Sequence, residues 1–220
     1  MNSLKYLLLG AVLVMEKFSQ IEAAYGLVEP PNRGMVYEKV CPRALDDDWH
    51  EYRCGKLWVE DNLLYRTKPV EGEICAACGD LLQDIQPRPF ENGGKYGRGL
   101  IVRSYAAGSI IKVVVRMRTQ KDGYYEFWVC PLQNETMIET EACFDQYKLT
   151  NLSGEYQIPR WGDNNLTEMN LHLPQNLTCD HCVLRSQFVT MNKLPCNDGR
   201  LSFTCGEQRV YRTCSDVKIQ

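Results

Sequence analysis

The stretch LIVRSYAAGSIIKVVVRMRTQKDGYYEFWV, residues 100–129, decides the fold class. It contains three runs that are rich in β-branched and aromatic residues, Leu100–Tyr105, Ser109–Arg118 and Tyr124–Val129. Such runs favour β-strands. The pairs Ala107-Gly108 and Asp122-Gly123 separate them, and Asp-Gly is a strong signal for a hairpin turn. The stretch therefore predicts an antiparallel meander.

Similar runs continue along the chain beyond this stretch. Further strands are predicted at Glu155–Pro159, Glu168–Leu173, Val183–Thr190 and Gln208–Tyr211. Short strands divided by Asn, Gly and Pro indicate an all-β protein, a β-sandwich. By contrast, residues 25–89 are irregular and rich in Cys, Pro and Gly, which predicts long bridged loops with a short helical turn around 46–52. The polar region 134–152 is predicted to be an exposed loop.

The first residues have the composition of a secretory signal peptide. One Lys precedes an apolar run that ends by Met15, which is too short to span a bilayer, and Ala23 and Ala24 offer a cleavage site. We therefore expect a signal peptide at 1–24, cut within one residue of Ala24, and one secreted, extracellular domain at 25–220. The net charge stays at -3 after cleavage, and no second apolar stretch follows. Nucleic acid and membranes are thus not expected as partners.

Cysteines and glycosylation motifs agree with export. An oxidising compartment would join most of the eleven cysteines in disulfides, and the odd count leaves one that is free or links another chain. The two C-x-x-C pairs, Cys75/Cys78 and Cys179/Cys182, leave a zinc site open as an alternative. Four N-x-S/T sequons predict glycosylation at Asn134, Asn151, Asn165 and Asn176.

Several segments, read in order, resemble the insect-type lytic polysaccharide monooxygenases, auxiliary activity family fifteen, which carry the chitin-binding type-4 domain label. The matching segments span nearly the whole mature chain: Tyr25-Gly26, Pro30-Pro31-Asn32-Arg33, Cys54-Gly55, Cys75–Asp80, Pro87–Gly97, Gly123–Phe127, Cys130-Pro131, Cys143–Asp145, Leu173-Pro174, Leu177–Cys179, Cys182–Leu184 and Tyr211–Asp216.

The resemblance implies an immunoglobulin-like or fibronectin-like β-sandwich with a flat face that lies on crystalline polysaccharide. It also implies five bridges among ten cysteines, with Cys41 as the extra one. Those ten are Cys54, Cys75, Cys78, Cys130, Cys143, Cys179, Cys182, Cys196, Cys205 and Cys214. Enzymes of this family hold copper in a histidine brace, formed by the N-terminal His, a second His and an axial aromatic residue.

This sequence departs from the family at the brace. Tyr25 stands in place of the N-terminal His, and Lys121 stands in place of the second His, so that only the axial Tyr211 remains. A neutral phenol is a poor copper ligand, and an ammonium group has no lone pair to offer. We therefore expect that the family cofactor, copper, is lost and that the chain has no catalytic residues.

Histidines, carboxylates and tryptophans are the remaining candidates for chemistry or binding. His50, His172 and His181 are interpreted as surface or packing residues, although a surrogate metal site is the alternative. Carboxylate pairs such as Glu139/Glu141 are interpreted as solvated loop charges rather than the acid pair of a glycoside hydrolase. The four tryptophans, Trp49, Trp58, Trp128 and Trp161, are interpreted as core or loop packing.

The sequence thus favours a secreted, non-catalytic protein that binds chitin or a related polysaccharide. Tyr25, Lys121, Asp122 and Tyr211, at the former copper face, are the predicted binding residues, with Tyr124 as a further candidate for stacking. Two alternatives remain open. One is a structural or signalling glycoprotein that binds a protein partner, with Cys41 linking two chains. The other is an active monooxygenase with an unorthodox metal site.

Overall fold

The computed structural model describes residues 25–40, 53–59, 67–69, 74–117, 122–162, 164–196, 198–203 and 205–220. The expected signal peptide, the predicted helical turn at 46–52, Cys41, His50, Trp49 and Lys121 lie outside these residues. Within them, no helix combines the length and the apolar character of a membrane span.

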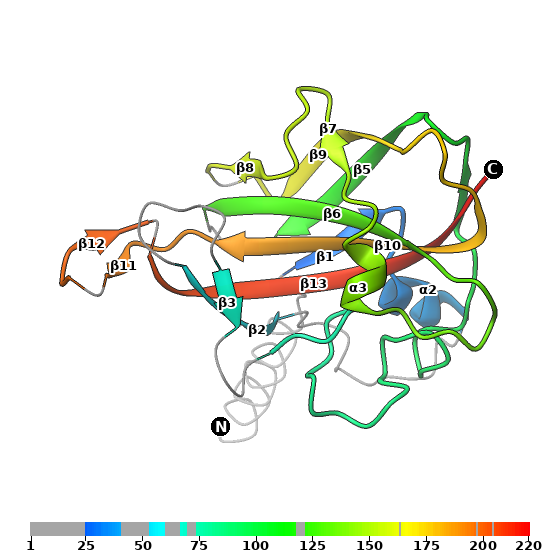
Figure 1. The fold of residues 1–220 in the computed structure, drawn as a ribbon, viewed down its shortest axis with the longest axis horizontal. Helices are drawn as coiled ribbons and strands as arrows, with labels where there is room; N and C mark the ends of the chain where they lie inside the picture. The colour runs from blue at the N-terminus through cyan, green and yellow to red at the C-terminus, as the bar shows by residue number, and fades with distance from the viewer. Residues whose placement is uncertain are drawn as a thin grey trace, which may run out of the picture.

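Two mainly antiparallel sheets form the sandwich (Figure 1). The smaller sheet has four strands in the order β1-β5-β9-β7. Their bounds are β1 Tyr25–Glu29, β5 Ile110–Met117, β9 Leu166–His172 and β7 Thr150–Asn151. Along β5, Ile111, Val113, Val115 and Met117 are buried, whereas the residues between them face outward. This alternation is the period of a strand with one buried face.

The larger sheet has the order β3-β2-β13-β10-β6-β8, and β4 joins it by pairing in parallel with β13. The bounds are β2 Arg53–Val59, β3 Thr67–Pro69, β4 Arg103–Tyr105, β6 Gly123–Pro131, β8 Ile158–Arg160, β10 Cys179–Thr190 and β13 Gly206–Ile219. A small hairpin of β11 Leu194–Pro195 and β12 Leu201–Ser202 extends past the end of the sandwich (Figure 1).

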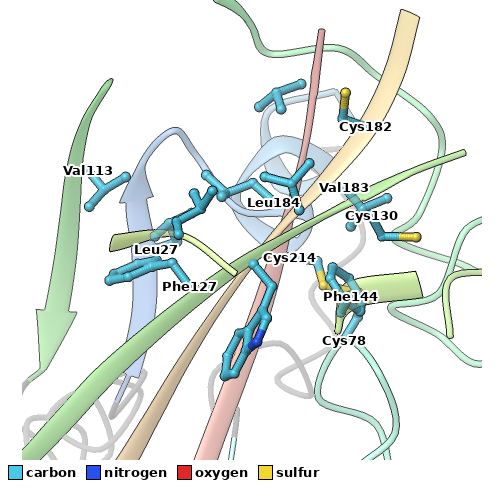
Figure 2. Packing of buried hydrophobic residues seen from close by; sticks show 14 of the residues in the cluster. Leu27, Cys78, Val113, Phe127, Cys130, Phe144, Cys182, Val183, Leu184 and Cys214 are labelled. Carbon is cyan, nitrogen blue, oxygen red and sulfur yellow. A yellow bond between two sulfur atoms is a disulfide. The ribbon is translucent and has the colours of Figure 1, made fainter. Parts of the chain in front are cut away.

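Side chains from both sheets meet in the core. Figure 2 shows Leu27 and Val113 from the smaller sheet opposite Phe127 and Leu184 from the larger one. All four residues are fully buried. The structure therefore confirms the all-β, immunoglobulin-like sandwich that the sequence predicts.

Two helices flank the larger sheet. Helix α2, Arg33–Val40, begins after Asn32, whose Oδ1 accepts a hydrogen bond from the backbone N–H of Met35 at 3.0 Å. Helix α3, Glu141–Phe144, begins after Thr140, whose hydroxyl accepts from the N–H of Cys143. The buried Phe144 contradicts the prediction that 134–152 is simply an exposed loop.

The predicted hairpin at Asp122-Gly123 is wrong. β5 pairs with β1 and β9, and β6 pairs with β10 and β8, so the chain crosses from one sheet to the other here. Gly123 is required by close packing rather than by the geometry of a turn. A Cβ at this position would lie 2.2 Å from the carbonyl oxygen of Val189 and 2.4 Å from the ring of Phe188.

Candidate functional site

Tyr25, the residue in place of the first copper ligand, is a core residue. Its side chain has no exposed surface, and its hydroxyl is hydrogen-bonded to the hydroxyl of Ser186 on β10. Its ring stacks on Phe188 at 6.2 Å between centroids and packs against Tyr211 at 5.9 Å. The alternation of β1 explains this direction, because Leu27 faces the same core.

Burial also sets the chemistry of this phenol. Loss of solvent raises the pKa of Tyr25 well above its ordinary value, and the opposing hydrogen bond from Ser186 does not offset this. The phenol is therefore neutral near pH 7 and is engaged with Ser186. A neutral phenol does not replace the amine and imidazole nitrogens that grip copper in a brace, so Tyr25 does not fit the metal.

Tyr211, the axial residue of the expected site, lies beside Tyr25 but is also only 2 % exposed. Stacking on a sugar requires an exposed ring face, and neither Tyr25 nor Tyr211 offers one. The expectation that these two rings contact a glycan is therefore corrected: both belong to the packing beneath the surface. Tyr124 is 7 % exposed and is therefore also largely buried.

Asp122 lies at the surface above this cluster and organises the neighbouring loops. Its carbonyl oxygen accepts from the backbone N–H of Met191 at 2.8 Å, and its Oδ1 accepts from the N–H of Gly162 at 3.2 Å. Asp122 is thus half-buried and joins the segment after β10 to the segment after β8. Lys121, next to it in sequence, lies outside the described residues, so its predicted role stays a prediction.

An aromatic groove of about 450 Å³ adjoins Asp122, and the sequence analysis missed it. Trp161, which was interpreted as packing, is 63 % exposed on its wall. The groove is lined by Tyr124, Gly154, Glu155, Tyr156, Gln157, Pro159, Trp161 and Met191. The turn-rich run Gly162-Asp163-Asn164-Asn165 was the available signal, because such a run predicts a connecting loop and loops run over the surface.

The groove lies at the end of the sandwich where the mature chain is expected to begin. Gly123 pairs with Arg160, the residue before Trp161. It also pairs with Thr190, the residue before Met191. At the same end, Met117 pairs with Tyr25, and its N–H donates to the carbonyl oxygen of Asn165. This is the end that carries the expected polysaccharide-binding face.

The described histidines lie far from this end. His172 is exposed and pairs with Ile110, seven residues along β5 from the Met117 that pairs with Tyr25. Seven strand residues span about 23 Å. His181 precedes Phe188 by seven positions on β10, and its Nε2 lies 2.8 Å from Asp216. Neither histidine is placed to donate to a metal beside Tyr25.

Among the described residues, four disulfides join eight of the ten predicted cysteines. They are Cys78–Cys214, Cys130–Cys143, Cys179–Cys182 and Cys196–Cys205. Cys75 is also disulfide-bonded, and the side chain of Cys54 is outside the described part of the structure. The zinc alternative is therefore wrong, since both C-x-x-C pairs are oxidised and thiolates are required.

Cys78, Cys214 and Glu139 come close enough to suggest a metal site, but their chemistry excludes one. The two sulfurs form a disulfide, so neither is a thiolate. Glu139 is instead paired with Arg33. It is also buried, which contradicts the interpretation of this carboxylate as a solvated loop charge.

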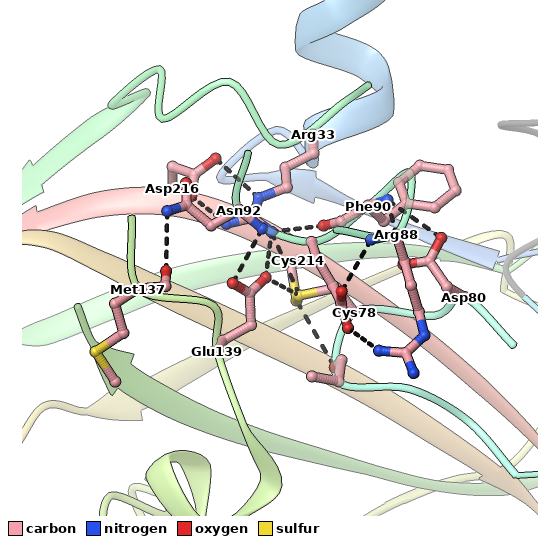
Figure 3. A network of polar contacts seen from close by, with 12 residues as sticks. Arg33, Cys78, Asp80, Arg88, Phe90, Asn92, Met137, Glu139, Cys214 and Asp216 are labelled. Carbon is pink, nitrogen blue, oxygen red and sulfur yellow. Dashed lines mark hydrogen bonds and ion pairs between the residues drawn. A yellow bond between two sulfur atoms is a disulfide. The ribbon is translucent and has the colours of Figure 1, made fainter. Parts of the chain in front are cut away.

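Arg33 is the centre of the buried polar network in Figure 3. Its guanidinium donates to both oxygens of Asp216, at 2.9 and 2.6 Å, to Glu139 and to the carbonyl oxygen of Phe90 at 2.5 Å. Burial alone would lower the pKa of Arg33, but the two carboxylates outweigh it and raise that pKa. Asp216 has its pKa lowered, because Arg33 and His181 outweigh the effect of burial. The network is structural and ties helix α2 to β13.

The four predicted glycosylation sites are accessible to different degrees. Asn134, Asn165 and Asn176 are exposed, and Asn151 is half-buried. The side chain of Asn151 is engaged locally, since its Nδ2 donates to Glu155 at 2.9 Å and its Oδ1 accepts from two backbone N–H groups.

Comparisons with known proteins agree with the fold and with the resemblance. A family model described as "Lytic polysaccharide mono-oxygenase, cellulose-degrading" matches residues 26–217. The chain is similar to the AA15 lytic polysaccharide monooxygenase of Thermobia domestica in its Cu(I) state, with 32 % identity and a TM-score of 0.74 over 89 % of this chain and 98 % of that one. It also shares its fold with the cellulose-active monooxygenase CelS2 in complex with copper, at 15 % identity and a TM-score of 0.50 over 88 % and 97 % of the two chains. No curated protein matches the sequence. The chain therefore belongs to the lytic polysaccharide monooxygenase family, as a member of its insect type.

Proposed function

We propose that this protein is a secreted, non-catalytic member of the family that binds chitin or a related polysaccharide. The burial of Tyr25 supports the loss of catalysis. The position that supplies the amine and the imidazole in a brace carries a neutral phenol that is packed against Phe188 and bonded to Ser186. Nitrogen ligands are thus replaced by a group that holds the two sheets together.

The aromatic groove supports polysaccharide binding. Trp161, which is 63 % exposed, provides an apolar face on which a sugar ring can stack, and Glu155 and Gln157 provide polar groups that can bond its hydroxyls. Lys121 and Asp122 stay in the proposed site. Asp122 acts by positioning the loop of Trp161, through its hydrogen bond to Gly162. Disulfides and surface sequons fit export to an oxidising, extracellular setting.

A pull-down with insoluble chitin tests the binding. The secreted, processed protein should be retained on chitin, whereas a denatured sample should not. Cellulose serves as the second matrix because the family description and CelS2 name it. Trp161→Ala should weaken retention about tenfold, since burying a large aromatic face contributes roughly 1.4 kcal/mol or more.

The matched control is Ile110→Ala, which removes a side chain that is 55 % exposed at the opposite end of the sandwich. It should leave retention unchanged. If neither matrix retains the protein, polysaccharide binding is refuted and a protein partner becomes the leading function. Equal loss from both variants would refute the groove as the binding site.

A copper titration tests the loss of catalysis. The processed protein should show no stoichiometric, tight copper binding and no peroxide-dependent release of oxidised oligosaccharides. Tight binding together with oxidised products would overturn the non-catalytic proposal and would make the chain an active monooxygenase with an unorthodox metal site.

A further inference from the structure

A second, larger hollow of about 800 Å³ lies at the other end of the sandwich. It is beside the Cys182–Pro131 pairing, whereas the aromatic groove is beside the Gly123–Thr190 pairing of the same two strands. Three segments form its walls, and the hydrogen bond from the N–H of Leu132 to the carbonyl oxygen of His181 joins two of them at 2.9 Å. The hollow is lined by Asn92, Gly93, Gly97, Arg98, Gly99, Ile101, Leu132, Gln133, Asn134, Glu135, Asp180 and His181.

The hollow has the mixed surface that a sugar requires. Ile101, which is 40 % exposed, and Leu132 give an apolar patch that suits the C–H face of a pyranose ring. Around that patch, Glu135 and Asp180 offer carboxylates and Arg98 offers a guanidinium, which suit hydroxyl and acetamido groups. Three glycines, Gly93, Gly97 and Gly99, contribute backbone without side chains to its lining.

Asn134, on the wall of this hollow, is a sequon asparagine in the run Asn134-Glu135-Thr136. Its side chain is exposed and has a defined orientation. Its Oδ1 accepts from the backbone N–H of Thr136 at 3.1 Å and from the hydroxyl of Thr136 at 2.9 Å. These bonds use the oxygen and not the Nδ2 atom, which is the atom to which an N-linked glycan attaches.

We propose that the hollow is a docking site for the protein's own glycan, with the first sugars of an Asn134-linked chain packed over Ile101 and Leu132. Covalent attachment at the wall supplies a high effective concentration, so that weak sugar contacts suffice for docking. The proposal rests on passage through the secretory pathway and is independent of chitin binding at the opposite end. Asn165 and Asn176 are exposed and do not line this hollow, so glycans on them are the comparison for the glycan on Asn134.

The accessibility of each glycan to an endoglycosidase tests the proposal. The full chain is secreted from a eukaryotic host, digested while folded, and followed by glycopeptide mass spectrometry at each sequon. The glycan on Asn134 should be removed at least tenfold more slowly than the glycans on Asn165 and Asn176. After reduction and denaturation, the rates should become equal.

Two matched variants locate the contact. Ile101→Ser should raise the native cleavage rate at Asn134 several-fold, whereas Ile110→Ser, which changes an exposed isoleucine that does not line the hollow, should not change it. Equal native rates at the three sequons, or no effect of Ile101→Ser, would overturn docking. An unmodified Asn134 would also overturn it, and chitin retention, measured separately, would still decide the proposed function.

Discussion

Replacement of Tyr25 by Ala separates a core tyrosine from a surface ligand. The ring is fully buried between Phe188 and Tyr211, and truncation of a buried aromatic side chain costs about 3–5 kcal/mol. Ser186 also loses the partner of its buried hydroxyl, which costs about 1–3 kcal/mol more where the site cannot admit water. Because the neighbouring rings can partly close the cavity, we expect the free energy of unfolding to fall by about 4 kcal/mol.

Urea unfolding with the disulfides intact, followed by tryptophan fluorescence, measures this change. With a slope of about 2 kcal/mol per molar urea, the midpoint should fall by about 2 M. Trp161→Ala is the control, because replacing an exposed side chain changes the free energy of unfolding by less than about 0.5 kcal/mol. If the free energy of unfolding of Tyr25→Ala lies within about 0.5 kcal/mol of the wild-type value, the reasoning is refuted and Tyr25 is a surface residue.

Two further perturbations test the buried charges. Asp216→Asn should lower the free energy of unfolding by about 3–5 kcal/mol, because it removes the ion pair with the buried Arg33. Asp180 forms an exposed ion pair with Lys218, so calorimetry should find the stability of the control Asp180→Asn unchanged. Burial raises the pKa of the Asp80 carboxyl to about 7. Between about pH 4 and 7 the folded protein therefore keeps a proton on Asp80 that the unfolded chain has lost. The free energy of unfolding falls as the pH rises through this range. Asp80→Asn should therefore match the wild type near pH 4 and exceed its stability by up to about 4 kcal/mol at pH 8, and a difference that does not change with pH in urea titrations would contradict this.

The sequence predicted the strands of the sandwich well where one face is buried. The alternation in β5 and the β-branched runs of β10 carry enough local information, because the strand period of two is written in the residues themselves. The sequence-based prediction failed where a tertiary contact determines the local structure. Asp122-Gly123 has the composition of a hairpin turn, but the glycine is needed for the close approach of Val189, which lies 66 residues later in the chain.

The N-terminal elements were missed for a related reason. β1 is only five residues long, and α2 has no run of apolar residues at helical spacing, so neither has a strong local pattern. Arg33 holds α2 in place through Asp216, a partner that no local pattern reveals.

For the candidate site, the sequence predicted which residues lie together but not which of them are exposed. Motif position indicated that Tyr25 and Tyr211 lie together, and they do. Motif position did not indicate whether these tyrosines are buried or exposed, because a tyrosine on a strand can face either side of the sheet. The same uncertainty led to the opposite error for Trp161, which was expected to be packed and is exposed.

The place of β13 in the larger sheet has a consequence for how the protein is made. This strand is synthesised after every other strand of its sheet, yet it lies in the middle, between β2 and β10, and it carries Cys214 and Asp216. A nascent chain that has reached Ser202 therefore holds two half-sheets with open edges, which can pair with the wrong partner. The larger sheet is completed only when its central strand arrives, and oxidation of Cys78 before Cys214 is available would form an incorrect bridge.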